Sequence, residues 1–253
     1  MPEKISVPYG EGYVHAVLEG GNLRVLKPRA PPKSRDLKAL AEALNNPVEA
    51  QSLDDFFKPE EKTLFLVNDA TRPTPTARVL EALRPWLRRV DAHFLIACGA
   101  HLPPSESQLK RIFGRFYAEY RSRVGFSSPG YGCYLRLGET SRGHSVEIHE
   151  VAVKAERVFV VNSVEPHYFA GFTGGRKSIM PGVASEKSIE ENHRLALEEG
   201  AKPLALKGNP VHEDMEEAAE IYSAGRQIYS LAIVLDGNRR IASAWAGNLK
   251  ASF

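Results

Sequence analysis

The sequence has little of several features that would assign a protein to a special class. Cys98 and Cys133 are its only cysteines among 253 residues, and they lack the paired spacing of a zinc site. No stretch approaches the ~20 apolar residues of a membrane-spanning helix, and the first residues, MPEKISVPYGEGYV, lack the apolar core of a signal peptide. The 33 Lys and Arg and 31 Asp and Glu leave a net charge of only +2, too small to indicate a nucleic-acid partner. We therefore expect a soluble, reduced, cytoplasmic protein that binds neither nucleic acid nor membranes.

What the sequence does contain is the pattern of an α/β protein. Its residues are 43% hydrophobic and 25% charged, as in globular domains. Three short apolar segments read as strands: TLFLVN (63–68), DAHFLIACGA (91–100) and RVFVVNSV (157–164). The first two are each followed by a polar turn and a helical segment. Continuous apolar strands that alternate with helices predict an α/β fold, with a mostly parallel sheet covered by helices on both faces.

Smaller elements are predicted at both ends of the chain. Residues 4–28 alternate apolar and polar, which predicts a small N-terminal β-unit or hairpin with its turn at Gly20-Gly21. The segment IYSLAIVLDGNRRIASAWAG predicts a C-terminal β-hairpin with Asp236-Gly237 near its turn. Between 121 and 148 we expect loops with one short strand around residues 134–137.

Helix boundaries are predicted from capping residues and helix stops. SRDLKALAEALNNP reads as a helix capped by Ser34 and stopped at Asn45-Asn46-Pro47, and SESQLKRIFGRF as another. Further helices are expected after a Thr74 cap, after Asn209-Pro210, and after Ser188, where Glu191 completes a capping box and Gly200 is the stop.

Polar side chains follow all three predicted strands at the end where parallel sheets bind ligands. They are Asp69 and Arg72 after the first strand, His101 after the second and His167 after the third. Arg72 carries a planar fork of donors suited to a carboxylate or phosphate, and the alternative is an Asp69–Arg72 ion pair beside a capped helix. Two imidazoles from different strands could act as acid and base on either side of a substrate.

The segment EPHYFAGFTGGRKSIMPG (165–182) resembles a phosphate-binding loop but fails its pattern. Arg176 separates the last glycine from Lys177, whereas G-x-x-x-x-G-K-[ST] requires them to be adjacent. The glycines could still form an anion-binding nest, with Lys177 as a phosphate partner or a nucleophile; the alternative is a solvated lysine. His193 has no second histidine four residues away, so spacing alone leaves it unassigned.

Together, several segments resemble the lactate racemase family, whose enzymes are built around a nickel-pincer nucleotide. The matching segments are DATRPTP, GAHLPPSESQLKRIFG, EPHYFAGFTGGRKSIMPG, SIEENH and GNPVHEDMEEAA, in this order and at suitable separations. VPYGEG and AWAGNLKAS also look like family segments. The resemblance covers nearly the whole chain.

The resemblance implies a cofactor site. Lys177 matches the lysine that holds the pyridinium bis-thiocarboxylate mononucleotide through a thioamide bond. His193 matches the protein ligand of the nickel, whose other donors are a carbon and two sulfurs of the cofactor. Other residues of the same motifs are expected to contact the cofactor: Thr71, Gly174, Gly175 and Ser178. Protein made without the cofactor-maturation proteins is expected to be apo, with Lys177 free.

The resemblance also implies a reaction. His101 and His167 match paired acid/base histidines on opposite faces of the substrate, and Arg72 matches the arginine that engages its carboxylate, with Asp69 in the same motif. The carbinol hydride of a small 2-hydroxy acid or sugar acid moves to the cofactor and returns to the other face, while the histidines exchange the hydroxyl proton. The implied activity is that of a 2-hydroxy acid racemase or epimerase.

Two departures from the family pattern affect this expectation. Family members continue into a second domain, so residues 1–253 match the N-terminal cofactor-binding domain, with the usual C-terminal domain absent from this chain. The chain is then a fragment, or a short homologue that needs a partner such as a second copy. Leu102 stands where a basic residue usually follows His101, which bears on substrate choice. The competing interpretations are a cofactor-carrying module without turnover and a phosphate-binding enzyme that uses the glycine-rich loop.

Overall fold

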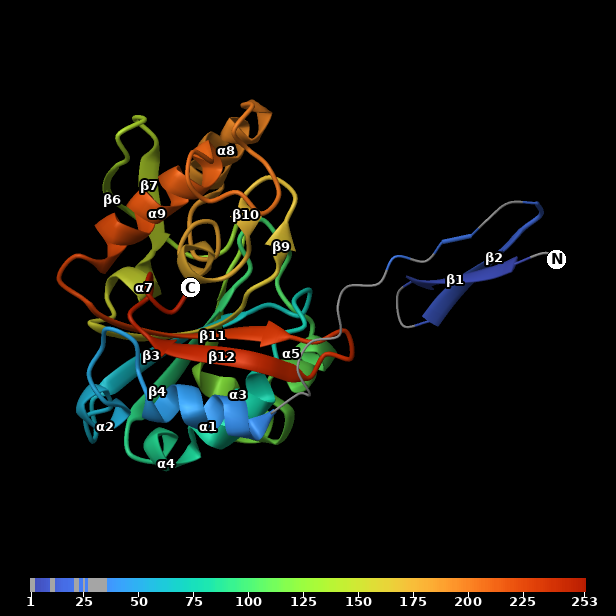
Figure 1. The fold of residues 1–253 in the computed structure, drawn as a ribbon. Helices are drawn as coiled ribbons and strands as arrows, with labels where there is room; N and C mark the ends of the chain where they lie inside the picture. The colour runs from blue at the N-terminus through green and yellow to red at the C-terminus, as the bar shows by residue number, and fades with distance from the viewer. Residues whose placement is uncertain (1–2, 10–11, 21–22, 25, 27–35) are drawn as a thin grey trace. The chain divides into compact units, whose positions relative to one another are not determined.

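The N-terminal part of the chain is an antiparallel β-hairpin. The computed structural model describes residues 3–9, 12–20, 23–24, 26 and 36–253, in two units that divide after Pro32. In the first unit, β1 (Glu3–Tyr9) pairs with β2 (Gly12–Leu18) (Figure 1). The predicted hairpin is confirmed, but its predicted turn is wrong. Tyr9 pairs with Gly12, whereas Gly20 follows the second strand and Gly21 lies outside the described residues.

The second unit is built on a six-stranded sheet with the order β12-β11-β8-β3-β4-β5. Neighbouring strands are parallel except for β12, which runs antiparallel to β11 at one edge. The strands span Lys62–Asn68 (β3), Asp91–Ala97 (β4), Val124–Ser127 (β5), Arg157–Ser163 (β8), Gln227–Leu235 (β11) and Ile241–Gly247 (β12). The predicted mostly parallel sheet and C-terminal hairpin are both confirmed, and β11 also joins the sheet.

The direction of strand addition changes between β3 and β8. From β3 the chain adds β4 and β5 on one side, and it then returns to add β8 and β11 on the other. The crevice beyond the carboxyl ends of two such strands is where open α/β sheets bind ligands. The sequence predicted the strands but not this order.

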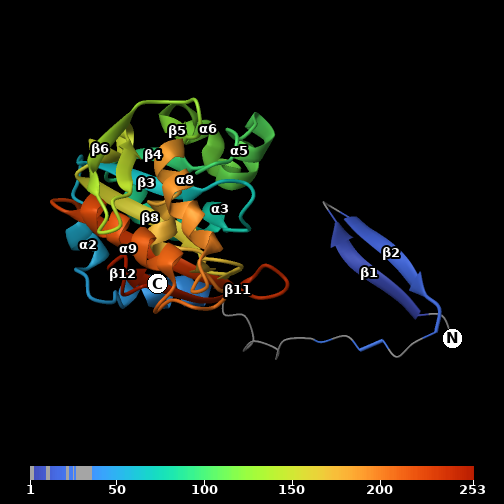
Figure 2. The same cartoon turned by 90° about the horizontal axis from the view of Figure 1, so that it is seen from above.

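Helices cover both faces of the sheet, and Figures 1 and 2 show the two layers. One face carries α1 (Leu37–Asn45), α2 (Leu53–Phe56), α3 (Thr76–Ala82), α4 (Arg84–Leu87), α5 (Glu106–Phe113) and α6 (Tyr117–Tyr120) over an aromatic core. The other face carries α7 (Glu150–Val153), α8 (Glu186–Arg194) and α9 (Pro210–Ser223) over an aliphatic core. Alternate residues of each central strand enter the two cores, which explains why the strands are apolar throughout.

Several helix boundaries differ from those predicted. The first helix ends at Asn45 as expected, but its N-cap is Asp36, and Ser34 lies outside the described residues. Helix α3 begins at Thr76 with Pro75 as N-cap, so the predicted Thr74 cap is wrong. The Thr74 hydroxyl instead lies 2.8 Å from Asn68 Oδ1 and 2.9 Å from Ser163 Oγ, bridging the ends of β3 and β8.

The helix that carries His193 starts three residues earlier than predicted. Ser185 is the N-cap of α8, and its side chain accepts a hydrogen bond from the Ser188 N–H. The predicted capping box of Ser188 and Glu191 is therefore wrong, and α8 ends at Arg194, before Gly200. The helices capped by Ser105 and Asn209 form as expected.

The segment 121–148 is more ordered than predicted. It contains β5, β6 (Tyr134–Glu139) and the start of β7 (Ser145–His149), of which only the strand around 134–137 was expected. The remaining elements are a two-residue strand pair, β9 (Pro166–His167) with β10 (Gly171–Phe172), and four 3₁₀ turns at Gly114–Phe116, Arg121–Arg123, Gly175–Ser178 and Leu195–Leu197. Within the described residues, no helix is both long and apolar enough to cross a membrane.

Candidate active site

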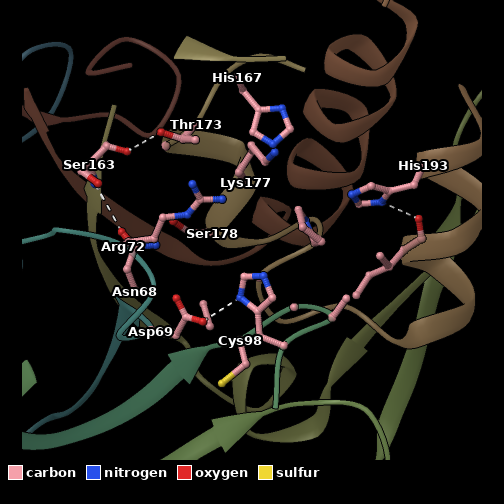
Figure 3. A pocket seen from close by; sticks show the side chains of 18 of the residues that line it. Asn68, Asp69, Arg72, Cys98, Ser163, His167, Thr173, Lys177, Ser178 and His193 are labelled. Atoms are coloured by element: carbon pink, nitrogen blue, oxygen red, sulfur yellow. Dashed lines mark hydrogen bonds and ion pairs between the residues drawn. The ribbon is translucent and has the colours of Figure 1, made fainter. Parts of the chain in front are cut away.

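A pocket of about 390 Å³ lies at the carboxyl ends of β3, β4 and β8, where the strand order reverses. Its lining brings together most of the residues singled out in the sequence: Asp69, Arg72, His101, His167, Gly174, Lys177, Ser178 and His193 (Figure 3). Thr71 and Gly175 do not line it, although the Thr71 hydroxyl binds Asp69, which does, and Gly175 directly follows Gly174 in the chain. The volume lies within the range of small-molecule sites.

His101 is held by a buried carboxylate. Its Nδ1 lies 2.7 Å from Asp69 Oδ2, and Asp69 is only 6% exposed. The Thr71 hydroxyl donates to the other carboxylate oxygen at 2.7 Å, so Asp69 pairs with His101 rather than with Arg72. We assign the Nδ1 proton to this bond, which leaves the Nε2 lone pair of His101 free to accept a proton.

His167 is held in the opposite tautomer. Its Nδ1 accepts hydrogen bonds from the Ala170 N–H at 3.3 Å and the Phe169 N–H at 3.5 Å, so the neutral ring carries its proton on Nε2. Burial, followed by the positive charges of Lys177 and Arg72, lowers the pKa of His167 to about 4. The neutral ring is therefore the resting form, with an N–H rather than a lone pair at Nε2.

Lys177 is a half-buried amine. Burial is the main cause that lowers its pKa to about 7, and the neighbouring Arg176 and Arg72 guanidiniums lower it further. Its Nζ lies 5.6 Å from the centre of the Phe169 ring, and no carboxylate of the described residues forms an ion pair with it. Lys177 is thus a partly buried residue of the pocket rather than an exposed surface lysine. An amine that is partly neutral near pH 7 is a competent nucleophile.

Arg72 supplies the remaining positive charge of the pocket. It follows β3 and lines the pocket, and its side chain extends toward Lys177 (Figure 3). Within the part of the chain that the structure describes, Arg72 forms no ion pair, because the nearby Asp69 is taken by His101. A guanidinium without a carboxylate partner is suited to bind the carboxylate or phosphate of a ligand.

His193 reaches the pocket from the last turn of α8. Its Nδ1 lies 2.7 Å from the Ile189 carbonyl oxygen, which can only accept, so Nδ1 carries the proton and Nε2 keeps its lone pair. An imidazole fixed in this way by a backbone carbonyl is the usual form of a metal ligand. Among the residues that the structure describes, no three His, Cys, Asp or Glu side chains converge to form a metal site. A metal held by His193 would take its other donors from a bound molecule.

The glycines of the loop serve to dock it on β8. A Cβ at Gly174 would lie 2.7 Å from Asn162 Oδ1, and the same oxygen accepts the Gly175 N–H at 3.0 Å. The Lys177 N–H is bound to the Gly174 carbonyl. Because these N–H groups are engaged within the protein, they are not free to form the anion-binding nest considered from the sequence.

Several residues that sequence reasoning missed also belong to the pocket. Asn68 and Ser163 end β3 and β8 and are joined through Thr74. Cys98 also lines the pocket, its carbonyl accepts the His101 N–H, and burial raises the pKa of its thiol to about 12. A polar residue at the end of an apolar strand was the available signal for Asn68 and Ser163. Ser178 was predicted, but its state was not: its hydroxyl is buried without a hydrogen-bond partner.

A family model and two curated proteins that match the sequence all point to the same family. Residues 9–203 match the family model described as the lactate racemase N-terminal domain. The chain is 30% identical over 254 residues to the lactate racemase of Thermoanaerobacterium thermosaccharolyticum, covering 96% of this chain and 59% of that protein. It is 29% identical over 226 residues to the lactate racemase of Lactiplantibacillus plantarum, covering 87% and 53%. The chain thus spans a little over half the length of these relatives.

Comparison with solved structures points to the same family. The lactate racemase apoprotein from T. thermosaccharolyticum superposes with a TM-score of 0.79 at 27% identity, over 99% of this chain and 60% of that one. A Thermotoga maritima protein, at 20% identity and a TM-score of 0.64 over 77% of this chain and 51% of that one, shares the fold. The matched family model covers most of the chain, which therefore belongs to the lactate racemase N-terminal domain family.

Proposed function

We propose that this chain is the cofactor-binding domain of a 2-hydroxy acid racemase or epimerase. The observation that carries the proposal is the convergence of Lys177, His193 and the oppositely poised His101 and His167 on one pocket. Each provides a different chemical capacity there: an amine nucleophile, a free imidazole lone pair, a proton acceptor and a hydrogen-bond donor. Family membership alone would support a fold and a racemase relationship, but not these assignments.

The pocket fits a nickel-pincer nucleotide attached to Lys177. Among the described residues, the amine has no carboxylate partner and the buried Ser178 hydroxyl has no hydrogen-bond partner, while His193 offers Nε2 as a nickel ligand. Apart from Asp69, whose carboxylate is taken, the charged lining residues are basic, which suits an anionic nucleotide. When bound, this cofactor would supply a reversible acceptor for the carbinol hydride of the substrate.

The protein's own side chains would bind and orient the substrate and move its hydroxyl proton. Arg72 would bind the carboxylate in a bidentate manner, which fixes the carbinol carbon relative to the two histidines. His101 would accept the hydroxyl proton at Nε2, and the buried Asp69 carboxylate would stabilise the resulting imidazolium. His167 would serve the opposite face, so that either enantiomer meets an imidazole.

The proposal extends to the whole protein and its partners. Because the chain spans 59% and 53% of two curated lactate racemases, we propose that residues 1–253 act with a second domain, or with a second copy, that completes the substrate cleft. Without it, the chain would be a cofactor-carrying module with no turnover. We further propose that maturation proteins load the cofactor in the cytoplasm, where Cys98 and Cys133 stay reduced.

Intact-mass spectrometry tests the cofactor assignment. The chain would be co-expressed with the maturation proteins of a lactate racemase system, and we expect a nucleotide-sized mass increase that Lys177→Ala abolishes. Lys187→Ala, an exposed lysine on α8, is the matched control and should retain the adduct. An unmodified wild-type chain, or an adduct that survives Lys177→Ala, would contradict the assignment.

An activity assay distinguishes the enzyme interpretation from that of a cofactor-carrying module without turnover. The loaded full-length protein would be incubated with single enantiomers of several 2-hydroxy acids and sugar acids, followed by chiral chromatography. Inversion of at least one supports the racemase or epimerase. If every chiral hydroxy acid tested stays unchanged while the adduct is present, the carrier interpretation replaces it.

A further inference from the structure

Next to Lys177 in the chain, and outside the lining of the pocket, lies a buried guanidinium that forms no ion pair with a carboxylate of the described residues. Arg176 is only 3% exposed, and no carboxylate of the described residues forms an ion pair with it, although Glu216 is near enough to raise its pKa. Burial lowers its pKa to about 10, so the group remains charged at neutral pH. A buried charge without a direct ion pair is costly unless its donors are satisfied in another way.

Three backbone carbonyls satisfy most of the donors of Arg176. Nη2 donates to Ala170 O at 2.8 Å and to Phe172 O at 3.0 Å, and Nη1 donates to Gly174 O at 3.3 Å. The face of the guanidinium lies 4.4 Å from the centre of the Phe253 ring. Charge-assisted bonds of this kind are about twice as strong as neutral ones, and a lysine could not reproduce their geometry.

All three carbonyls belong to the segment that joins His167 to Lys177. Gly171 and Phe172 form β10, which pairs with β9. In this pair Gly171 lies opposite His167. Ala170 uses its carbonyl for Arg176 and its N–H for His167 Nδ1. One side chain is therefore bonded to the backbone that fixes the tautomer of His167, and it directly precedes Lys177 in the chain.

We propose that Arg176 is a positioning residue that holds the imidazole of His167 and the amine of Lys177 in fixed relation to each other. The functional importance of this relation rests on the proposed function. The structural relation itself does not, and it can be measured on the apo chain.

The chain offers a matched control in Arg226. Its guanidinium also donates to three backbone carbonyls, those of Tyr222, Val153 and Ala224, and lies 4.8 Å from the centre of the Tyr222 ring. Like Arg176, it leaves its buried Nε without a partner. The carbonyls that it binds lie outside the segment that joins His167 to Lys177, so a general loss of stability affects both arginines while a positioning effect affects only Arg176.

Two substitutions separate the hydrogen bonds of Arg176 from its charge. Arg176→Met fills the space without charge or donors. Arg176→Lys keeps the charge, but one ammonium cannot bond three carbonyls in the geometry of the guanidinium fork. Both would be compared with Arg226→Met, and circular dichroism would establish that each variant is folded.

The first readout is the ¹⁵N spectrum of the His167 ring, assigned with His167→Gln. In the wild-type chain we expect the neutral Nε2–H tautomer with Nδ1 as acceptor. Both Arg176 variants should lose this signature because the Ala170 N–H is no longer held, whereas Arg226→Met should keep it.

The second readout is acylation of Lys177 relative to the exposed Lys187 at pH 7, resolved by peptide mass spectrometry. We expect the ratio to fall by about tenfold in both Arg176 variants, because the amine is displaced. The proposal would be overturned if folded Arg176→Met or Arg176→Lys kept both the wild-type His167 spectrum and the wild-type acylation ratio. It would also be overturned if Arg226→Met showed the changes that are expected of the Arg176 variants. If Arg176→Met does not fold, Arg176→Lys decides by the same criteria.

Discussion

The two ends of the parallel strands each carry a cavity, but their polar groups differ. At the amino ends of β3, β8 and β11, a cavity of about 480 Å³ is lined by Glu61, Arg157 and Gln227 among others. There the terminal nitrogens of Arg157 bind the side chains of Glu61 and Gln227 and the Phe56 carbonyl. At the carboxyl ends, Arg72 and Lys177 have no carboxylate among the described residues, and the Ser178 hydroxyl has no partner.

This difference shows which property of a cavity indicates a function. The amino-end cavity is the larger of the two, yet the terminal nitrogens of Arg157 are already bonded and only its buried Nε lacks a partner among the described residues, so a ligand would gain little there. The carboxyl-end pocket keeps cations and a hydroxyl that have no partner among the described residues, and its imidazoles are held in defined tautomers. Unsatisfied groups and shifted pKa values, rather than volume, identify the site.

The largest effect on activity is expected when one acid/base group is removed from the carboxyl-end pocket. In the loaded full-length protein, His167→Gln should lower the rate of racemisation by about 10²–10⁴-fold, because one face of the substrate loses its proton donor and acceptor. The adduct on Lys177 should persist, as intact-mass spectrometry would show. An unchanged rate would remove His167 from the reaction.

A smaller effect is expected from the carboxylate behind His101. Asp69→Asn should lower kcat by about 10- to 100-fold, because the imidazolium of His101 loses its stabilising charge. The amino end offers a matched control, since Asp91 Oδ2 lies 2.9 Å from His93 Nε2 in the same kind of pair. Equal losses in Asp69→Asn and Asp91→Asn would mean that Asp69 acts only through the fold.

Lys177 should make stability depend on pH in a defined direction. Its pKa is lowered from 10.5 to about 7 in the folded chain, so between these values the unfolded chain binds a proton that the native chain does not. The free energy of unfolding should therefore rise with pH over this range, by at most about 1.4 kcal/mol per pH unit from this group. Urea unfolding at pH 7, 8 and 9 would measure the slope.

Substitution assigns that slope to the residue. Lys177→Met should reduce it, whereas Lys154→Met, which removes an exposed lysine paired with Glu150, should leave it unchanged. A wild-type slope in Lys177→Met would show that the amine is not held in its neutral form.

The smallest effect is expected at the amino end. Glu61→Gln should lower the free energy of unfolding by about 1 kcal/mol, because the Glu61 side chain is 54% exposed and its ion pair with Arg157 is partly screened. Acylation of Lys177 should stay at the wild-type rate. A change at Lys177 would show that the two ends of the sheet are coupled.

The elements that the sequence predicted well are those with continuous hydrophobic patterns. Strands β3, β4 and β8 are apolar on both faces, and their placement already brought Asp69, His101 and His167 to one edge. Helix starts were less predictable, because several residues near each start can serve as caps. Ser185 rather than Ser188 caps α8, and only the folded chain decides between them.

The rest of the site depends on contacts between distant segments. His193 lies on a helix whose pattern carries no functional signal, and only the family resemblance selected it before the structure placed it at the pocket. Arg176 looked like an interruption of a phosphate-binding motif, yet its partners are carbonyls of the same loop. Buried unpaired groups such as the Ser178 hydroxyl cannot be recognised in a sequence, because burial is a property of the folded chain.

The central claim is that the carboxyl-end pocket inverts C2 of a 2-hydroxy acid. The hydrogen that leaves C2 is the same hydrogen that returns to its other face. The most direct test incubates the loaded full-length protein with one enantiomer of a 2-hydroxy acid that it racemises, in deuterated water. We predict racemic product that retains hydrogen at C2, because the imidazoles exchange only the hydroxyl proton with solvent. Deuterium at C2 in the inverted product would show instead that a histidine removes the carbon-bound hydrogen as a proton, and would contradict the claim.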